Sequence, residues 1–217
     1  MSGRPRFRIG LYLLAVLGGV GVGLALYLAL GLGGPPQATR FRPPKTTGKA
    51  LIGGAFELVD QNGKTRRDTD FRGRHMLVFF GYTHCPDFCP TGLQAMADAL
   101  DKLGADAAKV VPIFVTIDPE RDTPKVLKGY AENFHARLVA LSGTSAAVAK
   151  AAKAYRIYYA KSRTKGGKDY LMDHSTFTYL MGPDGNYVTH FAHGLEPAKM
   201  AERIRGHLRD AENKAKK

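Results

Sequence analysis

The chain has 217 residues, two cysteines, no tryptophan and a formal net charge of +13, from 32 Lys and Arg against 19 Asp and Glu. A composition of 44% hydrophobic and 24% charged residues is typical of a folded protein, so wholesale disorder is excluded. Two cysteines are too few for a disulfide scaffold, an all-cysteine zinc site or a cysteine-ligated iron–sulfur cluster.

The basic residues are dispersed along the chain instead of being clustered on one element. The sequence carries no zinc-finger, helix-turn-helix or RNA-binding motif to accompany them, which argues against nucleic-acid binding. The charge is better explained by attraction to anionic lipid or to an acidic protein partner, or simply by solubility.

An uncharged, apolar segment covers residues 9–32. As a helix that rises about 1.5 Å per residue, it is long enough to cross a hydrocarbon core of roughly 30 Å. Cleaved signal peptides have shorter apolar regions of about 7–15 residues that end at a small-residue cleavage site. We therefore expect residues 9–32 to form an uncleaved transmembrane anchor.

The segments that flank this anchor indicate its orientation. Residues 1–8 hold three closely spaced arginines, which favours a cytoplasmic N-terminus. Residues 33–50 are rich in proline and glycine and are typical of a linker. We expect a single-pass protein of the bacterial inner membrane, with the folded domain of residues 51–213 in the periplasm and a basic tail at 214–217.

Strand and helix patterns alternate through this domain. The first half of the domain is predicted to hold a hairpin at 56–68, a buried strand at 76–82, a helix with Leu93, Met96, Ala97, Leu100 and Leu103 on one face, and a buried strand at 110–117. The second half is predicted to hold a helix opened by Asp122-Thr123-Pro124, a short strand at 137–141 and a helix capped by Thr144 or Ser145. A hairpin at 177–191 and a closing helix with Met200, Ile204 and Leu208 complete the domain. This order predicts an α/β fold with a central mixed sheet. It matches a thioredoxin-like fold with an added N-terminal β-hairpin, preceded by one transmembrane helix.

Both cysteines, Cys85 and Cys89, lie in the segment GYTHCPDFCPTG, between a predicted buried strand and the next helix. Ligand sites of α/β sheets concentrate at this end of the strands, and a helix N-terminus favours thiolate. The two sulfurs are about one helical turn apart, so they can share one metal ion or form a disulfide. A purely structural disulfide is disfavoured, because closing so short a loop restrains the unfolded chain very little.

A two-thiolate metal site needs a further ligand, and His174 in YLMDHSTF is the best placed, where the chain enters the last hairpin. Asp173 is expected to orient it, and His84, beside Cys85, is a competing ligand. Two soft thiolates and one imidazole suit Cu(I), and serve Cu(II) with an added oxygen or water. Structural zinc requires four ligands, and no fourth Cys or His is evident.

Three segments resemble the signature blocks of the SCO/SenC copper-chaperone family: FFGYTHCPDFCPTGL, IFVTIDPERDTPKVLKGYAENF and YLMDHSTFTYLMGPDGNYV. The segment FELVDQNGK is similar to the N-terminal hairpin of that family. The resemblance spans residues 52–210 in the family's order and spacing, which makes it far more specific than the cysteine spacing alone.

The resemblance implies that Cys85, Cys89 and His174 bind copper, and that the protein helps to mature the dinuclear copper centre of cytochrome c oxidase subunit II. It also implies a second copper chaperone as donor and a thioredoxin-like reductant as further partners. Asp118 matches a family position near the site, where we expect it to support the loop geometry. The basic segment 161–168, which we predict to be a loop, is less typical of the family and is expected to shape partner choice.

The main alternative is a thiol–disulfide oxidoreductase that reduces the cysteines of the oxidase subunit or of another extracytoplasmic partner. Thioredoxin-type enzymes use C-x2-C and a cis-proline before the last hairpin. This chain has C-x3-C and no proline between Pro124 and Pro183, and it lacks the T-x-x-C spacing of peroxiredoxins. We therefore expect no catalytic residue and no turnover, while a redox disulfide between Cys85 and Cys89 leaves an accessory reductase activity open.

Overall fold

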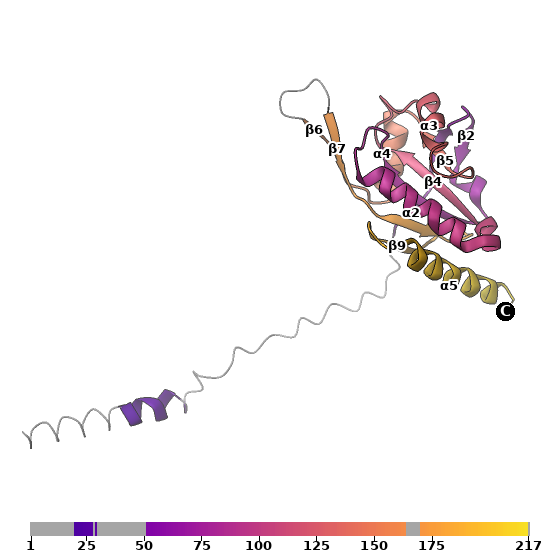
Figure 1. The fold of residues 1–217 in the computed structure, drawn as a ribbon. Coiled ribbons are helices and arrows are strands. Elements are labelled where there is room, and N and C mark those ends of the chain that lie inside the picture. The colour runs from indigo at the N-terminus through magenta and orange to yellow at the C-terminus, as the bar shows by residue number, and fades with distance from the viewer. Residues whose placement is uncertain (1–19, 28, 30–50, 164–169, 217) are drawn as a thin grey trace, which may run out of the picture. The chain divides into compact units, whose positions relative to one another are not determined.

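The computed structural model describes residues 20–27, 29, 51–163 and 170–216 (Figure 1). Contacts divide the chain into two units, Met1–Gly48 and Lys49–Lys217. In the first unit, residues 20–27 are helical. Among the described residues, no helix has both the length and the apolar character needed to cross a membrane. Most of the expected anchor at 9–32, and all of the expected segments 1–8 and 33–50, lie outside the described residues.

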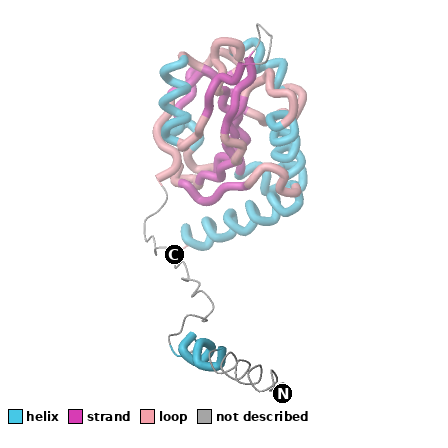
Figure 2. The backbone as a smooth tube through the Cα atoms, turned by 90° about the vertical axis from the view of Figure 1, so that its left-hand side faces the viewer, coloured by secondary structure: helices cyan, strands magenta, loops and turns pink. Residues whose placement is uncertain are grey.

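A mixed seven-stranded sheet forms the centre of the second unit, in the order β2-β1-β5-β4-β3-β8-β9. β3, β4 and β5 are parallel, and the remaining neighbours are antiparallel. Helices lie on both sides of the strands (Figure 2). The strands are β1 (Glu57–Asp60), β2 (Thr65–Arg67), β3 (His75–Gly81), β4 (Val110–Thr116), β5 (Val139–Ser142), β8 (Thr178–Met181) and β9 (Tyr187–Phe191). The predicted mixed sheet and both predicted hairpins are confirmed.

The α-helices of this unit form where the apolar periodicity predicts them. They are α2 (Phe88–Leu103), α3 (Pro124–Ala131), α4 (Ser145–Ala154) and α5 (Pro197–Ala215). All five predicted core residues of α2 are buried, and α2 packs against α5. Thr123 caps α3 and Thr144, not Ser145, caps α4, because each hydroxyl accepts a main-chain N–H of its own first turn. α5 continues to Ala215, beyond the expected domain end at residue 213.

A second, two-stranded sheet corrects one prediction. β6 (Tyr159–Arg163) pairs antiparallel with β7 (Tyr170–His174), and the two strands extend away from the large sheet as an arm (Figure 1). Residues 161–163 therefore belong to a strand, although we predicted a loop over 161–168; residues 164–169 lie outside the described part. The sequence YAKSR has no apolar alternation, so its strand conformation depends on main-chain pairing with β7.

Candidate metal centre

Cys85, Cys89 and His174 meet at the carboxyl end of β3. Their two sulfurs and one ring nitrogen all lie within 4.8 Å of one another. Cys89 is fully buried, Cys85 is 8% exposed and His174 is half-buried. Cys89 Sγ lies 3.4 Å from His174 Nε2. The structure thus brings three donor atoms together, although Cys89 and His174 are 85 positions apart in the sequence.

The loop from β3 into α2 places the two sulfurs. Cys85 N donates to the Tyr82 carbonyl at 3.3 Å, which closes a turn before the helix. Cys89 N, in the first turn of α2, donates to Cys85 Sγ at 3.4 Å, so an otherwise unpaired helical N–H points at the sulfur. Both cysteines are free thiols in this structure, so the predicted disulfide is not formed in it.

The two thiols differ strongly in acidity. The hydrogen bond from the Cys89 side chain lowers the pKa of Cys85 to about 3; burial opposes this shift, and a hydrogen bond from His174 adds to it. The same Cys85–Cys89 hydrogen bond, together with burial, raises the pKa of Cys89. The two thiols are therefore coupled, with ionisation favoured at Cys85 and opposed at Cys89.

The imidazole of His174 is oriented by the main chain. Nδ1 lies 2.8 Å from the Ser175 carbonyl oxygen, which can only accept, so Nδ1 carries a proton and donates it there, and Nε2 faces the two sulfurs. The Phe79 and Tyr82 rings pack against the imidazole in T-shaped arrangements, with ring centroids 6.3 and 5.9 Å away. These contacts hold the ring with one defined nitrogen facing the sulfurs.

Two further residues that were predicted for the site, Asp173 and His84, are not part of the three-donor cluster. The structure gives His174 another orienting partner than the expected Asp173: its Nδ1 donates to the Ser175 carbonyl, whereas Asp173 is exposed and, as a sequence neighbour on a strand, belongs to the opposite face. The competing ligand His84 is also exposed. Its Nδ1 lies 3.1 Å from Thr83 Oγ1, and the residue is not part of the three-donor cluster.

Asp118 connects the loop after β4 to the arm. Its carboxylate accepts the Tyr170 hydroxyl at 2.8 Å and the Arg121 guanidinium, which also stacks 3.8 Å from the centroid of the Tyr170 ring. Tyr170 begins β7, the strand that ends at His174. Asp118 thus lies in a contact that holds β7 beside the site.

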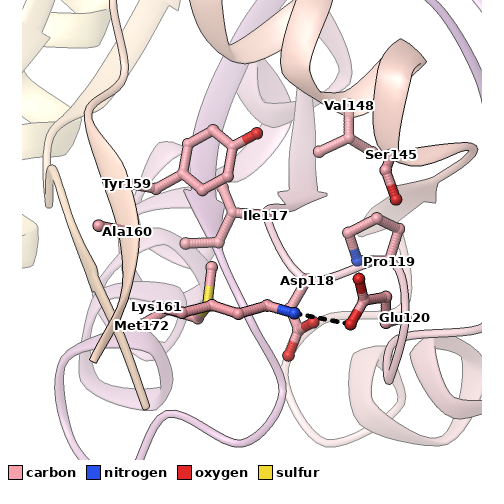
Figure 3. Close-up of a pocket in the computed structure, with 10 residues that line it drawn as sticks. All are labelled: Ile117, Asp118, Pro119, Glu120, Ser145, Val148, Tyr159, Ala160, Lys161 and Met172. Atoms are coloured by element: carbon pink, nitrogen blue, oxygen red, sulfur yellow. Dashed lines mark hydrogen bonds and ion pairs between the residues drawn. The ribbon is translucent and has the colours of Figure 1, made fainter. Parts of the chain in front are cut away.

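A cavity of about 300 Å³ separates this loop from the arm (Figure 3). Ile117, Tyr159 and Met172 form apolar parts of its wall. Across its mouth Lys161 and Glu120 form an ion pair at 2.7 Å. Both side chains are solvent-exposed, so the pair contributes little to stability. Lys161 on β6 thus contacts the loop through Glu120, in addition to carrying part of the basic charge.

The model of the SCO1/SenC family matches residues 44–209 of this chain. The chain belongs to the SCO1/SenC family. It is 38% identical to an SCO2-like protein of Rickettsia felis. This alignment of 190 residues covers 86% of this chain and 91% of the relative. The predicted family membership is therefore confirmed.

Solved SCO structures share the fold. Bradyrhizobium japonicum ScoI with copper bound is 45% identical, with a TM-score of 0.67 over 71% of this chain and 98% of ScoI. BsSco, a member of the Sco family of cytochrome c oxidase assembly proteins in which a disulfide switch was identified, is 26% identical, with a TM-score of 0.57 over 73% of this chain and 95% of BsSco. These likenesses confirm the predicted α/β, thioredoxin-like fold.

Two residues that support this SCO site were missed at the sequence level. Asp122, fully buried, accepts hydrogen bonds from Thr83 N at 3.0 Å, Thr83 Oγ1 at 2.5 Å and Thr116 Oγ1 at 2.6 Å. Tyr82 accepts the Met172 main-chain N–H through its hydroxyl at 3.1 Å. Asp122 fixes the start of the cysteine loop, and Tyr82 fixes β7. The sequence pattern predicts Asp122 only as part of a helix start. No spacing rule separates an aspartate that holds the cysteine loop from one that caps a helix.

Gly81 is required by the packing of Cys89. A Cβ added at Gly81 would lie 2.6 Å from Cys89 Sγ, 3.0 Å from the Phe114 ring and 3.2 Å from the Phe79 ring. We expect Gly81→Ala to displace the sulfur and to lower the free energy of unfolding by about 1–3 kcal/mol, as overpacking does. Urea denaturation of the full chain measures this change.

Gly129→Ala in α3 is the matched control, because nothing lies within 4 Å of its added Cβ. It should be neutral or stabilising by up to about 1 kcal/mol, as alanine favours helix. If the two substitutions changed stability equally, Gly81 would have no special role beside Cys89.

Proposed function

We propose that this chain is a copper-binding chaperone that assists assembly of the dinuclear copper centre of cytochrome c oxidase subunit II. The observation that carries the proposal is the convergence of Cys85, Cys89 and His174 within 4.8 Å, in a chain that belongs to a family with copper-bound members. Two thiolates and one imidazole are a soft donor set that favours Cu(I) and, with an added oxygen or water, accepts Cu(II).

The acidities of the donors suit capture of a copper ion. The low pKa of Cys85 favours its thiolate before copper arrives, and His174 Nε2 faces the same point. Only Cys89 must lose a proton, which the positive charge of the ion favours. Binding is therefore expected to release about one proton per copper ion at neutral pH.

Delivery would proceed by ligand exchange. His174 is half-buried, whereas Cys89 is fully buried. We infer that an incoming thiolate of the oxidase subunit displaces His174 first and the two cysteines afterwards. A second copper chaperone would supply the ion, and a thioredoxin-like reductant would keep the two cysteines reduced.

We also propose that the chain is anchored in the bacterial inner membrane by residues 9–32, with residues 1–8 in the cytoplasm. The uncharged sequence of this segment and the three preceding arginines support this topology. Residues 33–50 would then be the linker, and the domain at 51–213, with its basic tail at 214–217, would lie in the periplasm. No nucleic-acid partner enters this proposal.

A second candidate function is thiol–disulfide exchange, which the low pKa of Cys85 favours. In that reaction the Cys85 thiolate would attack a partner disulfide, and Cys89 would resolve the mixed disulfide. The partner would gain two thiols while Cys85 and Cys89 became a disulfide, so the reductant would have to regenerate them. Such activity would be accessory to copper delivery.

Copper binding by the reduced full-length chain tests the main proposal. We expect one tightly bound copper ion per wild-type chain and, in His174→Ala, a copper affinity weaker by at least about tenfold. Competition with a chelator of known affinity, followed by metal analysis, measures both. His84→Ala is the matched control and should bind as the wild type does. Unchanged binding in His174→Ala would exclude His174 as a ligand; reductase activity that survives His174→Ala but is lost in Cys85→Ser would favour the second function.

A further inference from the structure

The arm that carries His174 is not part of the large sheet. β7 pairs along one edge with β6, and these two strands form a sheet of their own (Figure 1). The two cysteines instead follow β3, a strand of the large sheet. The distance between the imidazole and the sulfurs therefore depends on contacts that join the arm to the loops of the large sheet.

In the described part of the chain, side chains bond the other edge of β7. Main-chain groups of residues two apart in a strand point to the same side. Met172 N donates to the Tyr82 hydroxyl oxygen at 3.1 Å. Two residues earlier, the Tyr170 carbonyl accepts Arg121 Nη1 at 3.0 Å. Tyr82 and Arg121 thus satisfy main-chain groups that a further strand would otherwise bond.

Tyr82 differs from Arg121 because it contacts both halves of the metal centre. Its carbonyl accepts Cys85 N at 3.3 Å, so it belongs to the turn that places the first sulfur. Its buried ring packs against the imidazole of His174, with ring centroids 5.9 Å apart. Its hydroxyl holds β7 two residues before His174. One residue thus connects the cysteine loop, the imidazole and the arm.

We infer that Tyr82 is a positioning residue that determines how strongly the site holds Cu(II) relative to Cu(I), an inference that rests on the proposed copper function. Two thiolates alone suit the soft ion Cu(I), whereas Cu(II) requires nitrogen and oxygen donors as well. The Tyr82 hydroxyl keeps His174 beside the sulfurs, where the imidazole is available as that nitrogen donor. Without the hydroxyl, β7 has one of these two side-chain bonds fewer, and the imidazole is held less firmly.

Tyr82→Phe in the full-length chain tests this role, since it removes the hydroxyl and keeps the ring. The Cu(II) affinity should fall by at least about tenfold, as loss of a group that positions a metal ligand does. The Cu(I) affinity should fall less, because both thiolates remain. Competition with chelators of known affinity for each ion measures the two affinities. Electron paramagnetic resonance of the Cu(II) form should show a weaker coupling to nitrogen than in the wild type.

Tyr130→Phe is the matched control. The hydroxyl of Tyr130 is also buried, but among the described residues it has no hydrogen-bond partner. Its removal should leave both copper affinities unchanged. In a His174→Ala background, Tyr82→Phe should lower the Cu(II) affinity no further, because its effect passes through the imidazole. A general disturbance of the fold would instead add to the effect of His174→Ala.

Hydrogen exchange of the copper-free chain supplies a readout that is independent of copper. The Met172 amide should exchange about tenfold faster in Tyr82→Phe than in the wild type, because the hydrogen bond that protects it is removed. Unchanged exchange at Met172 would overturn the inference. The absence of copper binding by the wild type would overturn the proposed function itself. Wild-type binding together with equal losses of Cu(I) and Cu(II) affinity in Tyr82→Phe would overturn only the role of Tyr82.

Discussion

Iodoacetamide is expected to alkylate Cys85 of the reduced, copper-free chain at a rate that barely changes between pH 5 and pH 8. The pKa of Cys85 is lowered to about 3, so its sulfur is a thiolate throughout this range. An ordinary thiol with a pKa of about 8.5 would react roughly 800 times faster at pH 8 than at pH 5, because its thiolate fraction grows almost tenfold per pH unit. Peptide mapping by mass spectrometry measures the rate at each cysteine.

The flat profile depends first on the Cys89 hydrogen bond and then on His174. Cys89→Ala should therefore return a steep rise with pH, and His174→Ala a smaller one. The absolute rate will be slow, because Cys85 is 8% exposed and a low-pKa thiolate is a weaker nucleophile. Cys89, whose pKa is raised, should stay unmodified. A rate at Cys85 that rose tenfold per pH unit in the wild type would contradict the assigned thiolate.

The large sheet and its helices follow from local patterns in the sequence. β3 and β4 are continuous apolar runs buried on both faces, and Thr123 and Thr144 mark helix starts with a defined hydrogen bond. β6 has no such pattern. Its conformation is fixed by pairing with β7, a partner that propensity and periodicity do not identify. The pairing of β6 with β7 could therefore be found only from the structure.

The two sulfur donors of the site were predictable because their chemistry is rare: two cysteines in the whole chain, at one strand end. The groups that position them were less so. His174 is oriented by the Ser175 carbonyl, which every residue possesses, so no side-chain pattern reveals it. Asp173 is adjacent in sequence but lies on the other face of the strand. Asp122 resembled a helix start, yet its carboxylate points at the cysteine loop.

Asp122→Ala is expected to lower the free energy of unfolding by at least about 4 kcal/mol, since it removes three hydrogen bonds and each hydrogen bond to a carboxylate contributes about 1.5–3 kcal/mol. The substitution removes the common acceptor of Thr83 N, Thr83 Oγ1 and Thr116 Oγ1. It leaves the Thr116 hydroxyl buried without that partner and frees the loop that leads to Cys85. Urea denaturation of the full-length chain, followed by near-UV circular dichroism, measures the loss.

Two variants make this prediction specific to the hydrogen bonds of Asp122. Asp122→Asn keeps one acceptor oxygen in the same volume, so its loss should be smaller than that of the alanine variant. Asp173→Ala removes an exposed carboxylate and should stay within about 0.5 kcal/mol of the wild type. If Asp122→Ala were as stable as Asp173→Ala, Thr83 and Thr116 would have other partners available and the cysteine loop would be held by the Tyr82 turn alone. Because that loop carries Cys85, the alanine variant should also weaken copper binding, whereas Asp173→Ala should leave it unchanged.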